Sequence, residues 1–462
     1  MKLNIIFPKR ENDWFNNAVG KLAMPVAPTY LAALTPHDVE IRITDMMAGD
    51  IVDYEEEVDL VAITVRTPVV VQAYRVADEF RSRDVSVILG GPHATVLPLE
   101  AKNHADAIVV GEAENIWNIL LKDFQTNNLK DFYIGGPFSS ESLPGEIYHI
   151  KERPDLHGIP RLRRDLLPRR RYLMDSIFTS RGCSYKCTFC GNPKLFGSTL
   201  RHRPIDEVVG EIETLPANYL NINDNIFGNL NDHQYYFDLY GELAKLTKKR
   251  FWFGEGALAV LGFDNGKALV KRAADSGLFR LVVGIESVHG QSITQAGARE
   301  KLGLNHGEHF NADKIQNSIK TIQDFGIEIF GFFMIGFDAD SPDTLRKIID
   351  FCHKTKIIPM ITILSPTPDS PLYERFKSEG RLLSDLSWNQ YVSPELIFKH
   401  PSMTGKEMQR IRDEILNDLY RLIPIAKRVI STISKRPHPI VFFSSLFTQL
   451  GIRQGVKKEQ TV

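Results

Sequence analysis

The sequence predicts an α/β protein with two successive parallel sheets followed by a helical region. Short apolar segments alternate with amphipathic stretches over two long parts of the chain, a pattern typical of buried parallel strands joined by helices. After Pro371 the pattern becomes helical and charged. The length of 462 residues is about three times that of a typical domain, so we expect two or three domains.

Residues 1–125 predict a doubly wound, flavodoxin-like domain. Its expected strands are Leu3–Phe7, Val39–Thr44, Leu60–Val65, Val85–Leu89 and Ala107–Val110. A helix with one apolar face is expected over Val70–Arg81, and glycine-containing turns follow the last two strands. Ligands of such sheets bind beyond the carboxyl ends of the strands, so we expect a ligand crevice at that edge.

Residues 126–172 predict an irregular linker. They contain the turn sequences Gly135-Gly136-Pro137 and Pro144-Gly145, and a basic tract that runs from Arg161 to Arg171. The arginines admit two interpretations. They are either solvated and paired with neighbouring carboxylates, or they hold an anionic substrate or cofactor.

Residues 173–372 predict a partial (βα)6 barrel, and residues 373–462 predict a helical region that includes Glu407–Leu422. The expected barrel strands are Ser176–Ser180, Tyr219–Asn223, Phe251–Gly254, Leu281–Gly284, Glu328–Ile335 and Met360–Leu364. Amphipathic stretches such as Asp206–Leu215 and Asp313–Phe325 separate them. A parallel barrel places its chemistry at the carboxyl ends of its strands.

Composition excludes several classes of protein. The 56 Lys and Arg residues balance 57 Asp and Glu residues, so no overall basic field would recruit nucleic acid or an anionic membrane. No apolar run is long enough to span a membrane, and the start lacks a signal peptide's apolar region, so we expect a cytoplasmic protein. The short apolar stretch Pro439–Phe447 packs on the barrel, caps a substrate cavity or touches a membrane surface.

Three of the four cysteines fall within eight positions, in a C-x₃-C-x₂-C pattern directly after an expected strand. Cys183, Cys187 and Cys190 could each hold one iron of a cubane cluster and leave the fourth iron open to an amino and a carboxylate group. A structural zinc site is the alternative, but it requires four ligands. Cys352 stands apart in a helical context and is interpreted as a buried structural thiol.

This cysteine loop, with Phe189 before the third cysteine, resembles the loop of the radical S-adenosylmethionine (SAM) superfamily. Further segments resemble its cobalamin-binding branch, so that the resemblance covers roughly residues 1–420. These segments are Pro28–Leu34, Gly90–Ala94, Val110–Glu114, Asn223–Asn225, Phe253–Glu255, Gly284–Ser287, Gly331–Asp338, Thr367–Tyr373 and Gly380–Leu382.

The resemblance implies that the three cysteines hold a 4Fe–4S cluster and that SAM, bound to its open iron, is cleaved to a 5′-deoxyadenosyl radical. It places Phe189 near the adenine, Glu255 and Glu286 as acceptors for the SAM amino group or ribose, and Ser287 as a donor to its carboxylate. The alternative for the two glutamates is an ion pair at the barrel rim. Asp224 and Asn225 are expected to face the substrate or SAM.

For the N-terminal domain, the resemblance implies that cobalamin binds without a histidine ligand. The cobalt-ligating motif Asp-x-His-x-x-Gly is absent, and the loop Pro8–Trp14 contains no histidine. The alternative is a domain that keeps the fold without the cofactor. His93 is interpreted as a hydrogen-bonding loop residue rather than a cobalt ligand. The candidate contacts are Thr67, Pro68, Gly90, Gly91, His93, Gly111 and Glu112.

The function implied by the resemblance is methylation of an unactivated carbon in a small or lipid-like metabolite. An electron donor such as flavodoxin or ferredoxin would be a partner. A radical SAM oxidative cyclase or rearrangement enzyme, with cobalamin assisting or absent, is the alternative within enzymes. A non-catalytic iron–sulfur sensor or scaffold is the alternative outside them.

Overall fold

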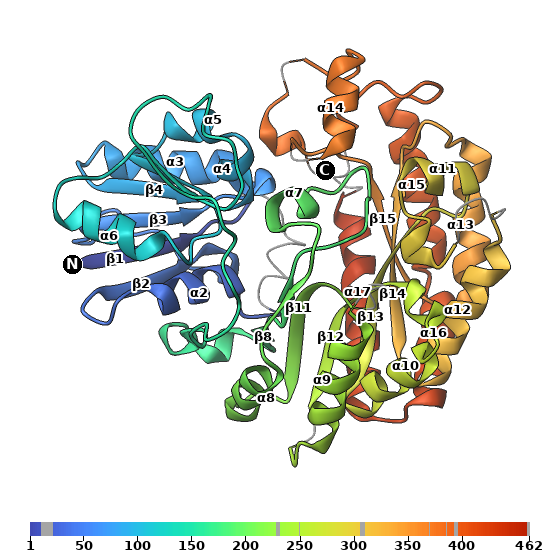
Figure 1. Cartoon of the computed structure of the whole chain (residues 1–462). Coiled ribbons are helices and arrows are strands. Elements are labelled where there is room, and N and C mark those ends of the chain that lie inside the picture. Colours follow the sequence, from blue (N-terminus) through green and yellow to red (C-terminus); the bar gives the residue numbers. More distant parts are fainter. Residues whose placement is uncertain are drawn as a thin grey trace. The chain divides into compact units, whose positions relative to one another are not determined.

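The computed structural model describes every residue except 11–21, 228–231, 249, 305–309, 369, 385, 392–395 and 460–462. The chain divides into two compact units (Figure 1). Unit 1 comprises Met1–Ser176, Arg201–Pro204 and Leu386–Tyr391. Unit 2 comprises Ile177–Leu200, Ile205–Asp385 and Val392–Val462.

Unit 1 is built on one seven-stranded sheet in the order β2-β1-β3-β4-β5-β6-β7, with parallel pairing throughout. The strands are β1 (Lys2–Phe7), β2 (Glu40–Asp45), β3 (Leu60–Thr64), β4 (Ser86–Gly90), β5 (Ala107–Gly111), β6 (Phe132–Gly135) and β7 (Ile147–Ile150). The helices are α2 (Val26–Leu34), α3 (Val70–Arg81), α4 (Pro92–Val96), α5 (Pro98–Lys102) and α6 (Trp117–Gln125). The predicted doubly wound domain is confirmed, and the strand order reverses between β1 and β3.

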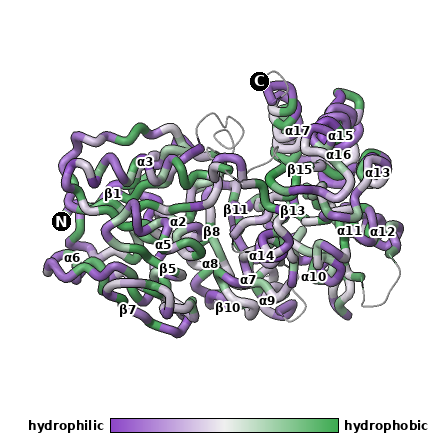
Figure 2. Tube along the Cα trace, turned by 90° about the horizontal axis from the view of Figure 1, so that it is seen from above, coloured by the Kyte–Doolittle hydropathy of each residue, from purple (hydrophilic) through white to green (hydrophobic). Residues whose placement is uncertain are grey.

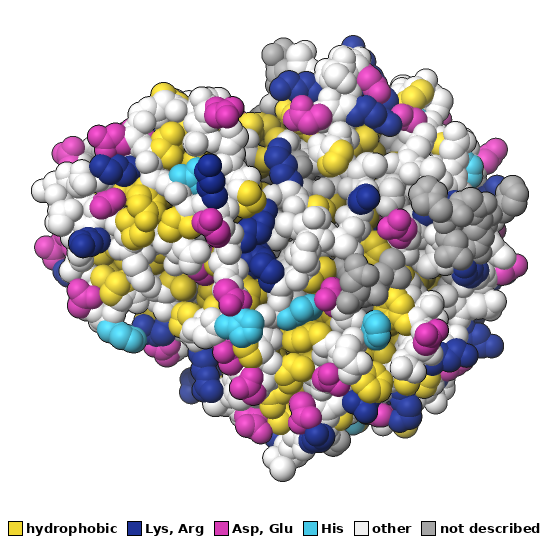
Figure 3. Space-filling view, viewed as in Figure 1, with side chains coloured by type: hydrophobic (Ala, Val, Ile, Leu, Met, Phe, Trp, Pro, Cys, Tyr) yellow, Lys and Arg dark blue, Asp and Glu magenta, His cyan; other side chains and the backbone are white. Residues whose placement is uncertain are grey.

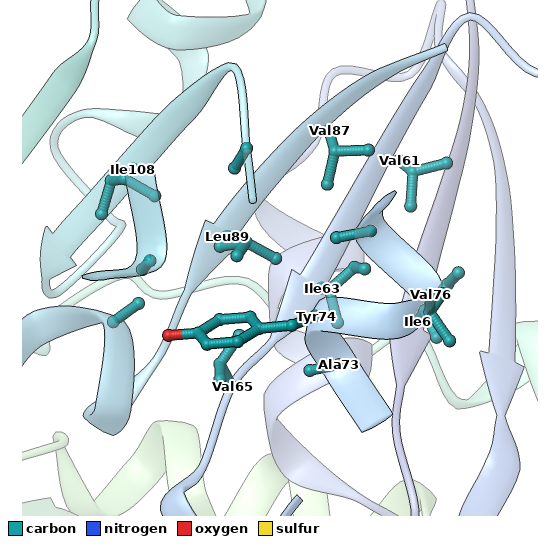
Figure 4. Packing of buried hydrophobic residues seen from close by; sticks show 14 of the residues in the cluster. Ile6, Val61, Ile63, Val65, Ala73, Tyr74, Val76, Val87, Leu89 and Ile108 are labelled. Carbon is teal, nitrogen blue, oxygen red and sulfur yellow. The ribbon is translucent and has the colours of Figure 1, made fainter. Parts of the chain in front are cut away.

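Adjacent residues of β1 enter two separate cores, one on each face of the sheet. Ile6 belongs to the same core as Val76 of α3 (Figure 4), whereas Ile5 belongs to the core on the other face, with Trp117 of α6. The alternation follows from the two-residue period of a strand. Because both faces are covered, the strands are apolar throughout, and this is the pattern that made them predictable.

Residues 126–172 are irregular only in part, because two segments of the predicted linker are strands. Phe132–Gly135 and Ile147–Ile150 form β6 and β7 and extend the sheet beyond β5. The glycine- and proline-rich turns that suggested irregular structure lie between these strands. Each strand has four residues, which is too short to give a periodic signal.

Unit 2 contains a six-stranded sheet in the order β15-β14-β13-β12-β11-β8, which confirms the partial barrel. Its strands are β8 (Asp175–Ile177), β11 (Tyr219–Phe227), β12 (Phe251–Gly256), β13 (Leu278–Glu286), β14 (Glu328–Ile335) and β15 (Ile358–Ile363). The helices around it are α7 (Asn192–Phe196), α8 (Ile205–Thr214), α9 (His233–Lys245), α10 (Gly266–Asp275), α11 (Gly290–Gln295), α12 (Ala312–Asp324) and α13 (Pro342–Thr355). From β11 to β15 every neighbouring pair is parallel.

The two faces of the barrel strands differ in burial. On β14, Phe333 is fully buried and its ring centroid lies 6.0 Å from that of Phe351 in α13, so this face is covered by helices. Phe330, Phe332 and Met334 alternate with it and are half-buried. Since successive side chains point to opposite faces, these three face the inside of the barrel.

Four helices follow the barrel: α14 (Pro371–Ser378), α15 (Gly405–Leu419), α16 (Leu422–Lys435) and α17 (Pro439–Glu459). α15, α16 and α17 pack together beside the sheet of unit 2 (Figure 2). The predicted helical region is thus confirmed, except that Leu386–Tyr391 belongs to unit 1. There Trp388 donates a hydrogen bond to Glu100 at 2.9 Å. Among the described residues, no helix combines the length and apolar character needed to cross a bilayer.

The surface agrees with the balanced composition of the chain. On the face shown in Figure 3, Lys and Arg side chains are interspersed with Asp and Glu side chains. The whole sequence carries a formal net charge of −1. No large field of one sign covers this face.

Candidate cofactor sites

The cysteine loop lies between the short strand β9 (Ser180–Arg181) and helix α7 in unit 2. Gly182 begins the loop with a φ of +103°, and a Cβ at this position would lie 2.3 Å from the carbonyl oxygen of Thr199. Gly297 allows the loop to pass equally close, because a Cβ there would lie 2.4 Å from the carbonyl oxygen of Lys186. Thr188 fixes the approach by donating from its amide to Ala296 at 3.0 Å. Backbone packing therefore determines the path of the loop.

The three predicted cluster ligands lie together in one packed group of side chains. Cys183 and Cys187 are buried with Tyr185, Ala257 and Ala259, and the half-buried Cys190 and Phe189 pack against this group. Burial raises the pKa of all three thiols, that of Cys190 to about 12, and the positive charge of Lys301 opposes this rise. The free chain therefore holds protonated thiols, and binding of metal would release their protons.

This donor set fits a cluster with one open iron. Cys352, the fourth cysteine, is buried in α13 and does not belong to this group. Within the described ranges, no three His, Cys, Asp or Glu side chains converge closely enough to hold a single metal ion. Three thiols of one loop, one of them half-exposed, match the ligand set that a site-differentiated cubane requires.

Next to the thiols, the structure places a buried ion pair between Lys301 and Glu286. Gly284 leaves the space for the pair, since a Cβ there would lie 2.3 Å from a Glu286 carboxylate oxygen and 2.6 Å from the Lys301 ammonium. Lys301 also lies 5.7 Å from the centre of the Phe189 ring. Glu286 has a φ of +65°, an uncommon value for a residue with a side chain, at the end of β13. Strained residues of this kind cluster at ligand sites.

The other predicted residues of unit 2 lie at the same end of the sheet. Glu255 is the penultimate residue of β12 and is reached by solvent, although protein surrounds it on most sides. Burial and the negative charge of Asp224 raise its pKa to about 7, and Lys301 opposes the rise. Ser287 is buried, and its hydroxyl accepts from the amide of His289 at 3.1 Å. Carboxylate, ammonium and hydroxyl groups thus gather beside the cysteine loop.

Asp224 is engaged within the fold. Its carboxylate accepts from the amides of Thr179 and Ser180 at 2.6 and 3.1 Å and from the Thr179 hydroxyl. It therefore holds the segment that leads into the cysteine loop. Asn225 belongs to β11 as well, but its side chain lies outside the described residues. A substrate-facing role for these two residues stays a prediction.

In unit 1, His93 lies at the carboxyl edge of the sheet and is fully buried. Its Nδ1 is 3.1 Å from the Thr67 hydroxyl and its Nε2 is 3.2 Å from the Glu100 carboxylate. The ring of Trp388 packs edge-on against the His93 ring, with 4.9 Å between the ring centroids. Both ring nitrogens are therefore used inside the unit, as a hydrogen-bonding loop histidine would use them.

The other predicted contacts at this edge also have partners in the fold. Glu112 is buried and pairs with Arg153 at 3.0 Å and Arg201 at 2.8 Å. A Cβ on Gly91 would lie 3.0 Å from the Val65 carbonyl oxygen, and one on Gly111 would lie 2.1 Å from that of Gly135. Close backbone packing thus explains these glycines without a ligand. The predicted contacts Pro68 and Gly90 lie at the same edge, whereas most of the loop that follows Phe7 lies outside the described residues.

Arg66 is the exception at this edge. It follows β3 at the point where the strand order reverses, and its guanidinium lies 4.9 Å above the ring of Phe7 at the end of β1. Its Nε is buried and has no hydrogen-bond partner among the described residues. Burial lowers the pKa of Arg66, and the charge of Asp45 only partly opposes this. A buried guanidinium without a bonded acceptor fits an anionic or carbonyl-rich ligand at this point.

Sequence reasoning missed Lys301 and Arg66. Lys301 lies fifteen positions after Glu286 in the chain, and nothing in the surrounding Glu300–Leu302 segment separates it from a surface lysine. Arg66 comes just after β3, an apolar strand at which the strand order reverses. Because ligands of such sheets bind at this point, the position of Arg66 could have identified it as a candidate.

Two protein families match the chain, one in each of the two units. The B12 binding domain family matches residues 16–121, and the Radical SAM superfamily matches residues 177–352. The fold and the cysteine loop define a radical SAM enzyme. The chain belongs to the radical SAM proteins that carry an N-terminal B12-binding domain, and its cofactors are a 4Fe–4S cluster, SAM and cobalamin.

Individual proteins resemble the chain over most of its length. Bacteriochlorophyllide d C-8(2)-methyltransferase of Chlorobaculum tepidum is 29% identical over 387 residues, which cover 80% of this chain and 79% of that protein. Hopanoid C-2 methylase of Rhodopseudomonas palustris is 25% identical over 65% of this chain and 54% of its own length. The solved structure of the radical SAM methyltransferase TsrM from Kitasatospora setae, with cobalamin and a 4Fe–4S cluster bound, is 17% identical. It covers 89% of this chain and 84% of TsrM with a TM-score of 0.63, a likeness of fold.

Proposed function

We propose that this enzyme transfers a methyl group to an unactivated carbon of an apolar, small or lipid-like metabolite. The observation that carries the proposal is the joining of a B12-binding domain to a radical SAM domain in a chain whose curated relatives are named methyltransferases. Together the three cofactors would supply a reducing electron, a radical initiator and a methyl group. The protein would contribute binding, orientation and exclusion of water.

In unit 2, Cys183, Cys187 and Cys190 would hold the cluster, because the three thiols lie in one packed group. Glu286 offers an acceptor for the SAM amino group, and Lys301 offers a donor for the SAM carboxylate. On binding, these two contacts to SAM would replace the contact between Glu286 and Lys301. Ser287 would add a neutral donor and Phe189 an apolar surface for the adenine. Glu255, with its pKa near 7, could accept a hydrogen bond from the ribose.

The inside of the barrel supports an apolar substrate. The half-buried residues that face it include Phe253 on β12, Val282 on β13, Phe332 on β14 and Met360 on β15. Gly284, Phe332 and Met360 are register partners on three adjacent strands, two residues before Glu286. An apolar surface this close to the reactive edge favours a hydrocarbon-rich substrate over a charged one.

In unit 1, Arg66 would hold the anionic phosphodiester of the cobalamin tail, since its guanidinium has no bonded acceptor of its own at the switch point. The backbone around Thr67, Gly90, Gly91 and Gly111 would line the same edge. We further propose a cytoplasmic location and an electron donor such as flavodoxin or ferredoxin, in keeping with the need for reduced thiols.

Anaerobic product analysis tests the proposal. The reconstituted holoenzyme would be incubated with reductant, methyl-labelled SAM and candidate isoprenoid or tetrapyrrole substrates. Label in a new carbon–methyl bond, together with 5′-deoxyadenosine, is the expected result. A cyclised or rearranged product without label would replace methyl transfer by the alternative chemistry. A full cluster with no SAM cleavage would favour a sensor or scaffold.

A further inference from the structure

The last helix, α17, turns aromatic side chains outward and polar side chains inward. Ser445 and Gln449 are fully buried, one helical turn apart. Phe443 is 51% exposed and Phe447 63% exposed, and Phe442 is exposed beside them. We call these three residues the aromatic face. A helix of a soluble protein normally buries its large apolar side chains. α17 buries Val441, Ile452 and Val456 with these two polar residues but leaves its phenylalanines exposed.

A buried polar network fixes this orientation of α17. Arg280 and Glu328, on β13 and β14, form a buried ion pair at 2.7 Å. Ser445 donates to Glu328, and Arg280 donates to the Thr448 hydroxyl at 3.0 Å. Rotating α17 to bury its phenylalanines would break these bonds and leave a buried ion pair with unsatisfied groups. The aromatic face is therefore a stable feature of the fold.

Helix α16 adds further exposed apolar side chains. α16 and α17 pack against each other and are joined by only three residues, Arg436–His438, so they form an antiparallel hairpin. Leu422, Ile423 and Ile430 on α16 are each more than 60% exposed. Among the described residues, large apolar side chains with such exposure occur elsewhere only as isolated examples such as Ile51 and Leu173. The hairpin thus concentrates exposed apolar surface.

The charge of the hairpin is equally one-sided. From Arg421 to Glu459, the last residue of α17, the sequence contains eight Lys or Arg residues and a single acidic residue, Glu459, which pairs with Arg412 of α15 at 2.9 Å. The whole chain has a net charge of −1, so the remainder is net acidic. Exposed aromatic residues on a helix hairpin with a large excess of cations are typical of helices that lie on anionic membranes.

We propose that the α16–α17 hairpin is a docking surface for a bilayer that contains anionic phospholipid. The phenylalanines would enter the boundary between headgroups and acyl chains, and the exposed Lys427, Lys457 and Lys458 would contact the headgroup phosphates. Other cations of the hairpin serve the fold, since Arg428 is buried and donates to Gln449, and Lys435 pairs with Asp324. The hairpin would lie on the membrane and not cross it. This proposal does not rest on the proposed function, because it concerns neither the cysteine loop nor the sheet edge of unit 1.

Vesicle sedimentation of the reconstituted full-length enzyme tests this proposal. We expect binding to phosphatidylcholine vesicles that contain phosphatidylglycerol, and at least about tenfold weaker binding to phosphatidylcholine alone, with the difference lost at high salt. Phe443→Ser/Phe447→Ser should weaken binding by on the order of 100-fold, because the bilayer would no longer bury these two aromatic side chains. Lys457→Gln/Lys458→Gln should weaken binding to the anionic vesicles and leave the phosphatidylcholine result unchanged.

Ile51→Ser is the matched control, since Ile51 is 86% exposed but lies in unit 1, and this variant should bind like the wild type. Cluster content should be equal in all variants, which separates loss of binding from loss of folding. Wild-type protein that stays in the supernatant with both vesicle types would overturn the proposal. A concentration-dependent dimer that Phe443→Ser/Phe447→Ser dissociates, without vesicle binding, would assign the hairpin to self-association instead.

Discussion

The carboxyl edges of the two parallel sheets carry similar residue types and use them differently. At the barrel edge of unit 2, three thiols lie in one packed group, and the buried Glu286–Lys301 pair lies beside Cys187. At the edge of unit 1, both ring nitrogens of His93 and the carboxylate of Glu112 already have hydrogen-bond or ion-pair partners in the same unit. Arg66 differs from these two residues, because its Nε is buried and has no hydrogen-bond partner among the described residues.

This difference shows that a polar residue at a strand end is weak evidence for a ligand. Histidine, glutamate and glycine have ordinary structural uses at such positions, as hydrogen-bond partners, ion-pair members and sites of close packing. Three neighbouring free thiols on one loop have no comparable structural use. The comparison therefore predicts large effects of substitution at the barrel edge, and at the edge of unit 1 a ligand effect only at Arg66.

The largest effect is expected at the cysteines. Cys187→Ala removes one of three thiolates, so the absorbance at about 400 nm and SAM cleavage should both be lost completely. Cys352→Ala is the control, because its thiol is buried in α13 away from the other three cysteines, and it should keep both signals. Iron and sulfide would be quantified in each anaerobically reconstituted variant. Full cluster content in Cys187→Ala would contradict the assignment.

A second large effect is expected at the buried ion pair. Glu286→Gln leaves the Lys301 ammonium buried without its counter-charge, which should lower the free energy of unfolding by about 3–5 kcal/mol. If the pair also binds SAM, SAM affinity should fall roughly 10- to 150-fold. Thermal unfolding and equilibrium binding of SAM to the reconstituted enzyme measure the two effects separately.

The double variant Glu286→Gln/Lys301→Met separates a ligand role from a structural one. It removes both charges together, so most of the lost stability should return while SAM affinity stays low. Normal SAM affinity in this double variant would mean that the pair is a structural element of the barrel rim. The contrast between the two sheet edges would then rest on the cysteines alone.

Much of this architecture could be predicted because the strands of both sheets are buried on both faces and stand out as apolar segments. β14 matches its predicted range, Glu328–Ile335, and the helix over Val70–Arg81 does so as well. The four-residue strands β6 and β7 could not be found, because they lie among glycine- and proline-rich turns. Residues Leu386–Tyr391 join unit 1 through a contact between Trp388 and Glu100, which are far apart in sequence.

Individual roles at the sites were harder to predict than the location of the sites. The cysteine spacing indicates a cluster, because few other structures need three thiols on one loop. Lys301 could not be identified, since a lysine in a short helical turn is usually solvated, and only the fold buries it against Glu286. For the same reason, the sequence could not show that Asp224 is bound to the backbone of Thr179 and Ser180.

A smaller effect, confined to one ligand, is expected at Arg66. Arg66→Met should weaken cobalamin binding roughly 10- to 150-fold, because a charge-assisted contact to the phosphodiester is lost. Cobinamide, which lacks that phosphodiester and the nucleotide tail, should bind the variant and the wild type equally. Arg75→Met is the control, since Arg75 is exposed on α3 and should leave both affinities unchanged. Equal weakening of cobalamin and cobinamide would exclude the contact to the phosphodiester.

The smallest effect on a cofactor is expected at His93, where the fold already uses both ring nitrogens. If cobalamin binds without a histidine ligand, the cob(II)alamin EPR spectrum should lack nitrogen superhyperfine splitting in the wild type and in His93→Ala alike. The substitution should still cost about 1–3 kcal/mol of stability, because Glu100 loses a partner in a half-buried position. Burial alone would raise the pKa of Glu100, and hydrogen bonds from His93, Tyr74 and Trp388 hold it below its ordinary value. Splitting that is present in the wild type and absent in His93→Ala would show that His93 leaves Glu100 to bind cobalt. The polar residues at the edge of unit 1 would then serve a ligand, as we propose for those at the barrel edge.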